Sequence, residues 1–287
     1  MIAVIVPATP PAASGRESSF PVAERACPVM LNDWVNGRYK RLVVEARAPL
    51  TGARAGEFFN LLCPQHGQDK PFLRRPMSVY AVHPAEGRIE FLYKLTGPGT
   101  RSLAALRPGE ALSVVGPLGR GFTLDPTWRR VLVLARGVGL ATMAPLVPLA
   151  HARGTAMSAV LSARAPEDLM RDQFVQGAQI DVHVVFDSDG SSAPERVELL
   201  LRRLIDAQRP DMLYTCGSTR LLSLAQRLCR EYAIRGEAAL EQQMACAFGV
   251  CLCCVREFDV AGKRVHRRVC CEGPVFDLGQ VVADSPW

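Results

Sequence analysis

The sequence contains no apolar run approaching the about 20 residues that a membrane-spanning helix requires. It also lacks a block of about five or more basic residues, so its net charge of +6 does not indicate a nucleic-acid-binding tail. The first six residues are apolar, but Pro7 follows them and no basic residue precedes them, which does not fit a secretory signal. We therefore expect a cytoplasmic protein with no membrane span and no nucleic-acid partner.

Cysteine, in contrast, is abundant: six of the ten cysteines lie between Cys246 and Cys271. In a reducing compartment such a cluster indicates metal or redox chemistry rather than disulfides. Cys246, Cys251 and Cys254 follow the spacing C-x4-C-x2-C, and fifteen residues separate Cys254 from Cys270. This arrangement is typical of plant-type [2Fe–2S] proteins, in which one loop provides three thiolates and a separate segment provides the fourth.

A structural zinc site is the alternative, because Cys251 and Cys254 also form a C-x2-C pair that Cys270 and Cys271 would complete. The second C-x2-C of a zinc ribbon is missing, which favours iron and sulfur. Cys253 and Cys271 adjoin proposed ligands, and we expect both to point away from the metal. The spacing alone does not decide between Cys270 and Cys271 as the fourth ligand.

The pattern along the chain predicts an α+β multidomain protein. Residues 1–25, rich in Pro, Ala and Ser, are expected to be a disordered extension. Short β segments in 26–125 predict an antiparallel β-barrel, and apolar runs alternating with amphipathic stretches in 126–232 predict a doubly wound α/β domain. Residues 233–287 form a Cys-rich tail. The expected strands are 40–46, 57–62, 77–81, 88–95 and 111–115 in the barrel, then 131–135, 157–162, 180–186 and 212–216; the expected helices are 100–106, 145–153, 194–207 and 219–232.

A possible flavin site lies in the barrel region. Arg75-Pro76-Met77-Ser78 combines an arginine that can bind a pyrophosphate with a serine hydroxyl that can bond a flavin ring. Leu92-Tyr93-Lys94 lies on the next expected strand, and Gly99-Thr100 opens a short helix whose N-terminus favours phosphate.

Together these segments resemble the electron-transfer subunit of NAD-dependent (type B) dihydroorotate dehydrogenases, in the ferredoxin-reductase superfamily, over about residues 27–280. The resemblance also selects Cys270 as the fourth ligand, because two residues separate the family's fourth cysteine from a Gly-Pro-Val-Phe segment. The segments that carry it are Arg75–Ser78, Tyr93-Lys94, Gly99-Thr100, Gly116–Phe122, Cys216–Ser218, Met244–Cys254 and Gly273–Phe276.

The resemblance implies an oxidoreductase subunit that works in a hetero-oligomer with a catalytic flavoenzyme and needs no proton-shuttling side chain of its own. FAD would contact Arg75 to Ser78, Leu92 to Lys94, Gly99 and Thr100. NAD(P)H would bind at the carboxyl ends of the α/β strands, near Gly137, Gly139, Cys216 and Gly217. Electrons would pass between NAD(P)H, FAD, a [2Fe–2S] cluster and the partner.

The sequence departs from the family at four places. Arg136 stands where a glycine is usual in the phosphate turn, and the small residue and proline that normally follow are displaced, with Thr142-Met143 before Ala144-Pro145. Ser218 replaces a proline and Ala247 a glycine. Arg136 would either contact a pyrophosphate or 2′-phosphate, or fill the space that the cofactor needs. Two other functions therefore remain open: a sister reductase serving a different dehydrogenase, with a degenerate NAD site, and a non-enzymatic scaffold with a zinc tail.

Overall fold

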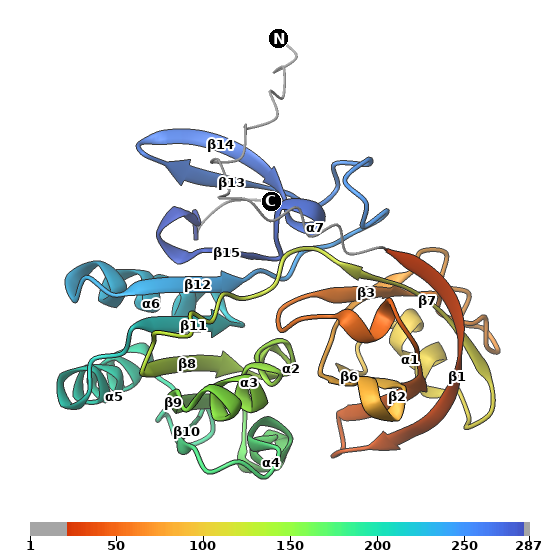
Figure 1. The fold of residues 1–287 in the computed structure, drawn as a ribbon, viewed down its shortest axis with the longest axis horizontal. Coiled ribbons are helices and arrows are strands. Elements are labelled where there is room, and N and C mark those ends of the chain that lie inside the picture. Colours follow the sequence, from red (N-terminus) through yellow and green to blue (C-terminus); the bar gives the residue numbers. More distant parts are fainter. Residues whose placement is uncertain (1–21, 284–287) are drawn as a thin grey trace.

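The computed structural model describes residues 22–283, which form a curled antiparallel sheet, a mostly parallel sheet with helices on both faces, and a C-terminal lobe (Figure 1). Within that range no helix is long and apolar enough to cross a membrane. Single 3₁₀ turns occupy Leu50–Gly52, Pro84–Glu86, Pro166–Asp168 and Leu278–Gln280.

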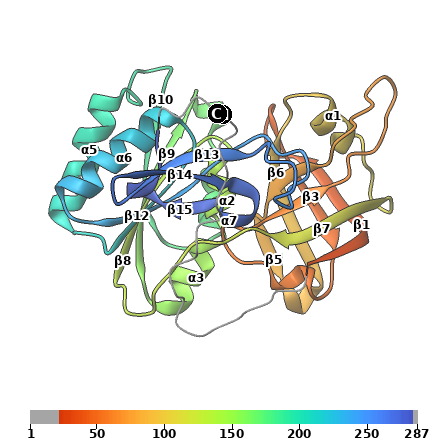
Figure 2. The same ribbon diagram turned by 90° about the horizontal axis from the view of Figure 1, so that it is seen from above.

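The first sheet has seven antiparallel strands in the order β4-β3-β7-β1-β2-β6-β5. The N-terminal half of β1 pairs with β7 and its C-terminal half pairs with β2, so the sheet curls around one core (Figure 2). Phe59 and Phe91 meet edge to face in this core, with ring centroids 5.6 Å apart. The elements are β1 (Ala23–Trp34), β2 (Tyr39–Glu45), β3 (Phe58–Leu61), β4 (Arg75–Ser78), β5 (Ala81–His83), β6 (Arg88–Lys94), α1 (Pro98–Ala104) and β7 (Ala111–Leu118).

The second sheet has the order β10-β9-β8-β11-β12-β15 and is parallel except for β15. The strand order reverses between β8 and β11, which is where doubly wound sheets open a ligand crevice. Helices α2 to α4 bury one face, and α5 and α6 bury the other. The elements are β8 (Arg130–Arg136), α2 (Gly139–Met143), α3 (Leu146–Arg153), β9 (Ala156–Ala163), α4 (Arg171–Val175), β10 (Asp181–Phe186), α5 (Pro194–Ala207), β11 (Met212–Cys216), α6 (Thr219–Glu231) and β12 (Arg235–Ala239).

The C-terminal lobe continues the core on the α5 and α6 face, because Phe258, Cys270 and Phe276 are buried there together with side chains of α6. The lobe consists of the cysteine loop, the hairpin β13 (Val255–Val260) and β14 (Lys263–Arg268), α7 (Val269–Glu272) and β15 (Val275–Asp277). Strand β15 returns to the main sheet and pairs with β12.

The expected architecture is confirmed, with local differences. Residues 23–25, expected in the disordered extension, belong to β1; residues 1–21 lie outside the described part. The expected strand at 77–81 is two strands, β4 and β5. The expected boundary near residue 233 does not coincide with the end of the α/β sheet. Strands β12 and β15, which lie beyond that residue, both join the sheet and form its edge.

Candidate functional site: a cavity shared by three parts of the chain

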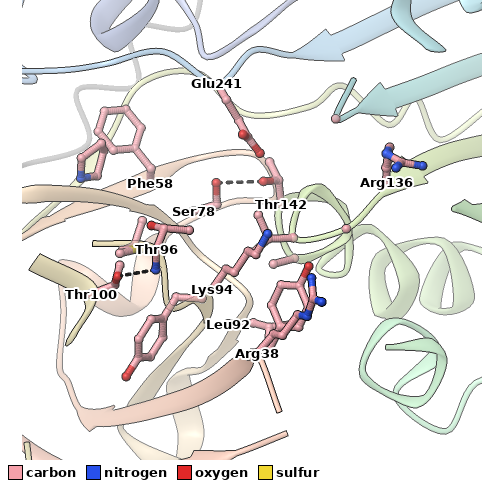
Figure 3. Close-up of a pocket in the computed structure, with 18 of the residues that line it drawn as sticks. Arg38, Phe58, Ser78, Leu92, Lys94, Thr96, Thr100, Arg136, Thr142 and Glu241 are labelled. Atoms are coloured by element: carbon pink, nitrogen blue, oxygen red, sulfur yellow. Dashed lines mark hydrogen bonds between the residues drawn. The ribbon is translucent and has the colours of Figure 1, made fainter. Parts of the chain in front are cut away.

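A cavity of about 640 Å³ lies between the curled sheet and the carboxyl edge of the parallel sheet (Figure 3). Strands β4 and β6 line one side, and the turns after β8 and β11 line the other. Met244 and Pro274, from the two ends of the C-terminal lobe, complete the wall. Of the cofactor-binding residues expected from the sequence, the lining includes Pro76, Met77, Ser78, Leu92, Tyr93, Lys94, Thr100, Gly137 and Gly217.

Arg75 and Gly99, which do not line this cavity, lie against each other at the start of α1. A Cβ atom on Gly99 would stand 2.6 Å from Arg75 Nε, so the guanidinium stem rests directly on the glycine backbone. Arg75 Nη1 donates to the carbonyl of Leu73 at 2.5 Å, and none of the ion pairs found in residues 22–283 uses Arg75. Its charge is therefore available to an anion.

The Thr100 hydroxyl is occupied within the chain. It accepts hydrogen bonds from the backbone N–H groups of Thr96 and Gly97, at 2.9 and 3.1 Å, and fixes the turn into α1. Tyr93 is fully buried, and its hydroxyl donates to Asn32 Oδ1 at 2.9 Å. The hydroxyl groups of Thr100 and Tyr93 are therefore used in hydrogen bonds within the chain, and the two residues contribute to the shape of the cavity wall.

Two polar side chains that no motif indicated face the cavity beside Ser78. Thr142 Oγ1 donates to Ser78 Oγ at 2.8 Å across the two domains, and Glu241 points toward this pair (Figure 3). Glu241 is open to the cavity but enclosed by protein on the other sides, and this burial raises the pKa of its carboxyl although Lys94 opposes the shift. Only the folded arrangement of β4, α2 and the end of β12 brings these groups together.

The nucleotide turns after β8 and β11 touch at the crevice. Gly137 and Gly217 have φ values of 54° and 135°, which favour glycine, and a Cβ atom on Gly217 would lie 2.8 Å from Arg136 Cβ. Gly139 and Cys216 lie behind the lining: a Cβ on Gly139 would meet the Cys216 carbonyl at 2.8 Å, and burial raises the pKa of the Cys216 thiol well above its usual value. Their positions indicate packing of α2 against β11.

The proposed cluster ligands form two pairs. The Cys246 sulfur accepts backbone N–H bonds from Phe248 and Cys251, at 3.3 and 3.4 Å, and these bonds lower the pKa of Cys246 to about 7 against the opposing effect of burial. A hydrogen bond from the Cys270 thiol lowers the pKa of Cys254 to about 6. Within residues 22–283, no three metal-binding side chains converge on one point.

The neighbouring cysteines differ from each other. Cys253 is exposed and its sulfur lies 3.7 Å from the Gln243 carbonyl. The expectation that Cys271 points away is wrong: its sulfur lies 3.4 Å from that of Cys270, and a Cβ on Gly249 would come within 2.3 Å of it. Both cysteines lie on the single turn α7, where adjacent side chains are only about 100° apart around the helix axis and therefore do not point in opposite directions.

Ala247 occupies a position where the backbone favours glycine. Its φ of 64° is left-handed, as are those of Gly249 and Leu252, and together they wrap the loop around Cys246. This left-handed conformation explains why the family usually has a glycine where this chain has Ala247.

Known proteins match the chain over nearly its whole length. The iron-sulfur cluster binding domain of dihydroorotate dehydrogenase B matches residues 241–282. The dihydroorotate dehydrogenase B (NAD(+)) electron transfer subunit of Desulforamulus reducens is 32% identical over 228 residues, covering 79% of this chain and 86% of that relative. The same subunit of a Geobacillus species is 29% identical and covers 91% and 95% of the two chains.

Two solved structures confirm the fold. One, described as NADH-dependent reduced ferredoxin-NADP oxidoreductase, has a TM-score of 0.75 and 24% identity over 91% of each chain. The ferredoxin reductase of carbazole 1,9a-dioxygenase has a TM-score of 0.60 and 17% identity, covering 75% of this chain and 68% of the other. With the relatives and the cluster-domain match, the conclusion is direct: the chain belongs to the family of dihydroorotate dehydrogenase B electron transfer subunits.

Proposed function

We propose that this subunit passes electrons between NAD(P)H, FAD and a [2Fe–2S] cluster, to or from the flavin of a catalytic dihydroorotate dehydrogenase subunit. One observation carries the proposal. A single cavity is bordered by the flavin-type strands β4 and β6, by the nucleotide turns after β8 and β11, and by Met244 and Pro274 beside the cluster loop. The family of the chain and the match of residues 241–282 support the same roles.

The residues present fit FAD. Residues of β4 and β6 line the cavity, and Arg75 directly precedes the lining residue Pro76. The Arg75 guanidinium lies beside Gly99 and can take a pyrophosphate. Ser78 and Thr142 place hydroxyl groups on the lining where a flavin ring would need hydrogen-bonding partners. We assign ring binding to Ser78, Leu92 and Lys94, and pyrophosphate binding to Arg75.

The residues also fit a nicotinamide nucleotide. Gly137 and Gly217 line the crevice without adding a side chain to it, between Arg136 and Val138 on one turn and beside Ser218 on the other. Ser218 lines the same crevice, and its buried hydroxyl has no hydrogen-bond partner among the described residues, which suits a ligand oxygen. When bound, FAD supplies the conversion from two-electron hydride transfer to one-electron transfer.

The four cysteines fit a [2Fe–2S] cluster through their spacing, and the match of residues 241–282 supports the same reading. A structural zinc ribbon would need a second C-x2-C, which the sequence lacks. We therefore assign Cys246, Cys251, Cys254 and Cys270 as the cluster ligands.

We propose that the partner subunit covers the cluster loop. Phe248, Val250 and Leu252 are 49%, 81% and 43% exposed, and an exposed apolar group of this kind marks an interaction surface.

None of the ten cysteines forms a disulfide, which supports a location in the reducing cytoplasm. We propose a domain boundary near residue 125, between the two large sheets, with the cluster lobe inserted between β12 and β15.

The test is anaerobic rapid mixing of the purified holo-subunit with NADH and, separately, NADPH. Flavin absorbance should bleach first, and the cluster should then be reduced, as followed by its visible absorbance. Bleaching by dithionite but by neither nucleotide would refute the nicotinamide role. A sister reductase is the second candidate, favoured by Arg136 in the phosphate turn. Co-purification from native cells decides it, because the captured chain is then either a dihydroorotate dehydrogenase or another flavoenzyme.

A further inference from the structure

Cys271 lies between the sulfur of one proposed cluster ligand and the loop that carries the other three. Its sulfur is 3.4 Å from the sulfur of Cys270. It also meets Gly249 in the loop, where an added Cβ atom would stand only 2.3 Å from the Cys271 sulfur. The Cys271 side chain therefore fills the space between α7 and the loop, and only a glycine leaves room for it there.

Arg268 ties the same loop to α7 beside this contact. It is the N-cap residue of α7, and its Nη1 donates a hydrogen bond to the Gly249 carbonyl at 3.3 Å. Its Nε and its backbone N–H both donate to Glu272 Oε2, at 3.1 and 2.8 Å, which holds the arginine along α7. Because the loop and α7 are joined at this point, the Cys271 sulfur has a defined position next to Cys270.

The chemistry of the two sulfurs decides which of them donates. A thiol is both a weak donor and a weak acceptor, so either sulfur can donate to the other when both are protonated. A cysteine that binds a metal does so as a thiolate, which has no proton to donate. With Cys270 as a cluster ligand, the hydrogen bond must therefore run from the Cys271 thiol to the Cys270 sulfur.

Hydrogen bonds to the sulfurs of an iron–sulfur cluster are among the factors that set its reduction potential. A donor stabilises the reduced form more than the oxidised form, because the reduced form carries one more negative charge. Cys271 is partly buried and packs against the core shared with α6, which limits competition from water. We propose that Cys271 is a positioning residue that raises the reduction potential of the cluster by donating a hydrogen bond to Cys270.

This inference rests on the cluster assignment of the proposed function, and its readout is a potential instead of an activity. The holo-subunit, purified without oxygen, is titrated with dithionite in the presence of redox mediators, and the EPR signal of the reduced cluster is followed. Cys271→Ala should lower the equilibrium constant for one-electron reduction about tenfold, the low end for a bond to a charged group because S–H is a weak donor. That factor corresponds to about 59 mV. Cys271→Ser keeps a donor, so its potential should lie closer to that of the parent than to that of Cys271→Ala.

The matched control is Cys253→Ala. Cys253 also adjoins a proposed ligand, Cys254, but it is exposed and its sulfur is directed to the Gln243 carbonyl at 3.7 Å. The substitution should leave the potential unchanged, and thermal unfolding should show that all variants are folded.

Three results would overturn the donor role alone. The first is an unchanged potential in Cys271→Ala. The second is an equal fall in Cys271→Ala and Cys271→Ser, because that pattern reports lost packing and not a lost donor. The third is loss of the cluster signal in Cys271→Ser, which would make Cys271 itself a ligand. A parent that contains zinc and gives no iron–sulfur EPR signal after reduction would overturn the cluster assignment as well.

Discussion

Gly99→Ala should separate FAD binding from stability, because the three nearest atoms that the new methyl group would meet all belong to Arg75. The added Cβ would stand 2.6 Å from Arg75 Nε, 2.9 Å from Cζ and 3.0 Å from Cγ. Ordinary contact begins near 3.4 Å, so Nε must retreat by 3.4 − 2.6 = 0.8 Å. That displacement takes the guanidinium out of register with a pyrophosphate.

Loss of a charged hydrogen bond costs about 1.5–3 kcal/mol, which corresponds to about tenfold to hundredfold weaker FAD binding. The fold should not suffer, since alanine is favoured over glycine inside a helix by up to about 1 kcal/mol and Gly99 lies within α1. Arg75→Ala should weaken FAD to the same extent, and the double variant should be no weaker than either single one.

The assay is titration of the apoprotein with FAD, followed by flavin fluorescence, together with thermal unfolding of the apoprotein. Gly97→Ala is the control, because a Cβ at Gly97 has no atom within 4 Å and its φ of −160° suits any residue. Wild-type FAD affinity in Gly99→Ala, or in Arg75→Ala, would refute the assignment of Arg75 to the pyrophosphate.

The remaining predictions concern the C-terminal part of the chain. Cys270→Ser should abolish the visible absorbance of the cluster and Cys271→Ser should preserve it; the reverse pattern would exchange the fourth ligand. Burial raises the pKa of Glu237, so its contribution to stability falls as pH rises through the unfolded-state value. Glu237→Gln should therefore raise the urea midpoint at pH 7 but not at pH 4, and equal shifts would contradict this cause. Ala261 has a φ of 52° in the exposed turn before β14, so Ala261→Asn should stabilise the hairpin by about 1 kcal/mol; a lower thermal midpoint would count against it.

Periodic elements could be predicted from the sequence because their signals are local. Helix α5 occupies the expected residues, 194–207, since proline begins it and apolar residues recur on one face. Strand β15 could not be found in the same way, because it has three residues and is defined by pairing with β12 across the whole cluster lobe. Strand β1 was hidden by the Pro-rich and Ala-rich composition around it.

The same distinction applies to the site. The cysteine spacing and the segment Arg75–Ser78 are local motifs, so they can be recognised in the sequence alone. Thr142 and Glu241 belong to no motif, and only folding brings them to Ser78.

Strands β12 and β15 form an antiparallel pair in which Ala239 lies opposite Val275. The whole cluster-bearing lobe, residues 240–274, is therefore topologically the loop of one β-hairpin. A two-residue turn is sufficient to close such a hairpin. The lobe is therefore an insertion between two paired strands of the sheet, and it does not simply follow the sheet as a C-terminal extension. A chain shortened in this way would lose the four candidate cluster ligands and the part of the cavity wall that Met244 and Pro274 provide. The candidate cluster ligands are thus carried by a single insertion between two neighbouring strands, and both ends of that insertion are fixed to the α/β sheet.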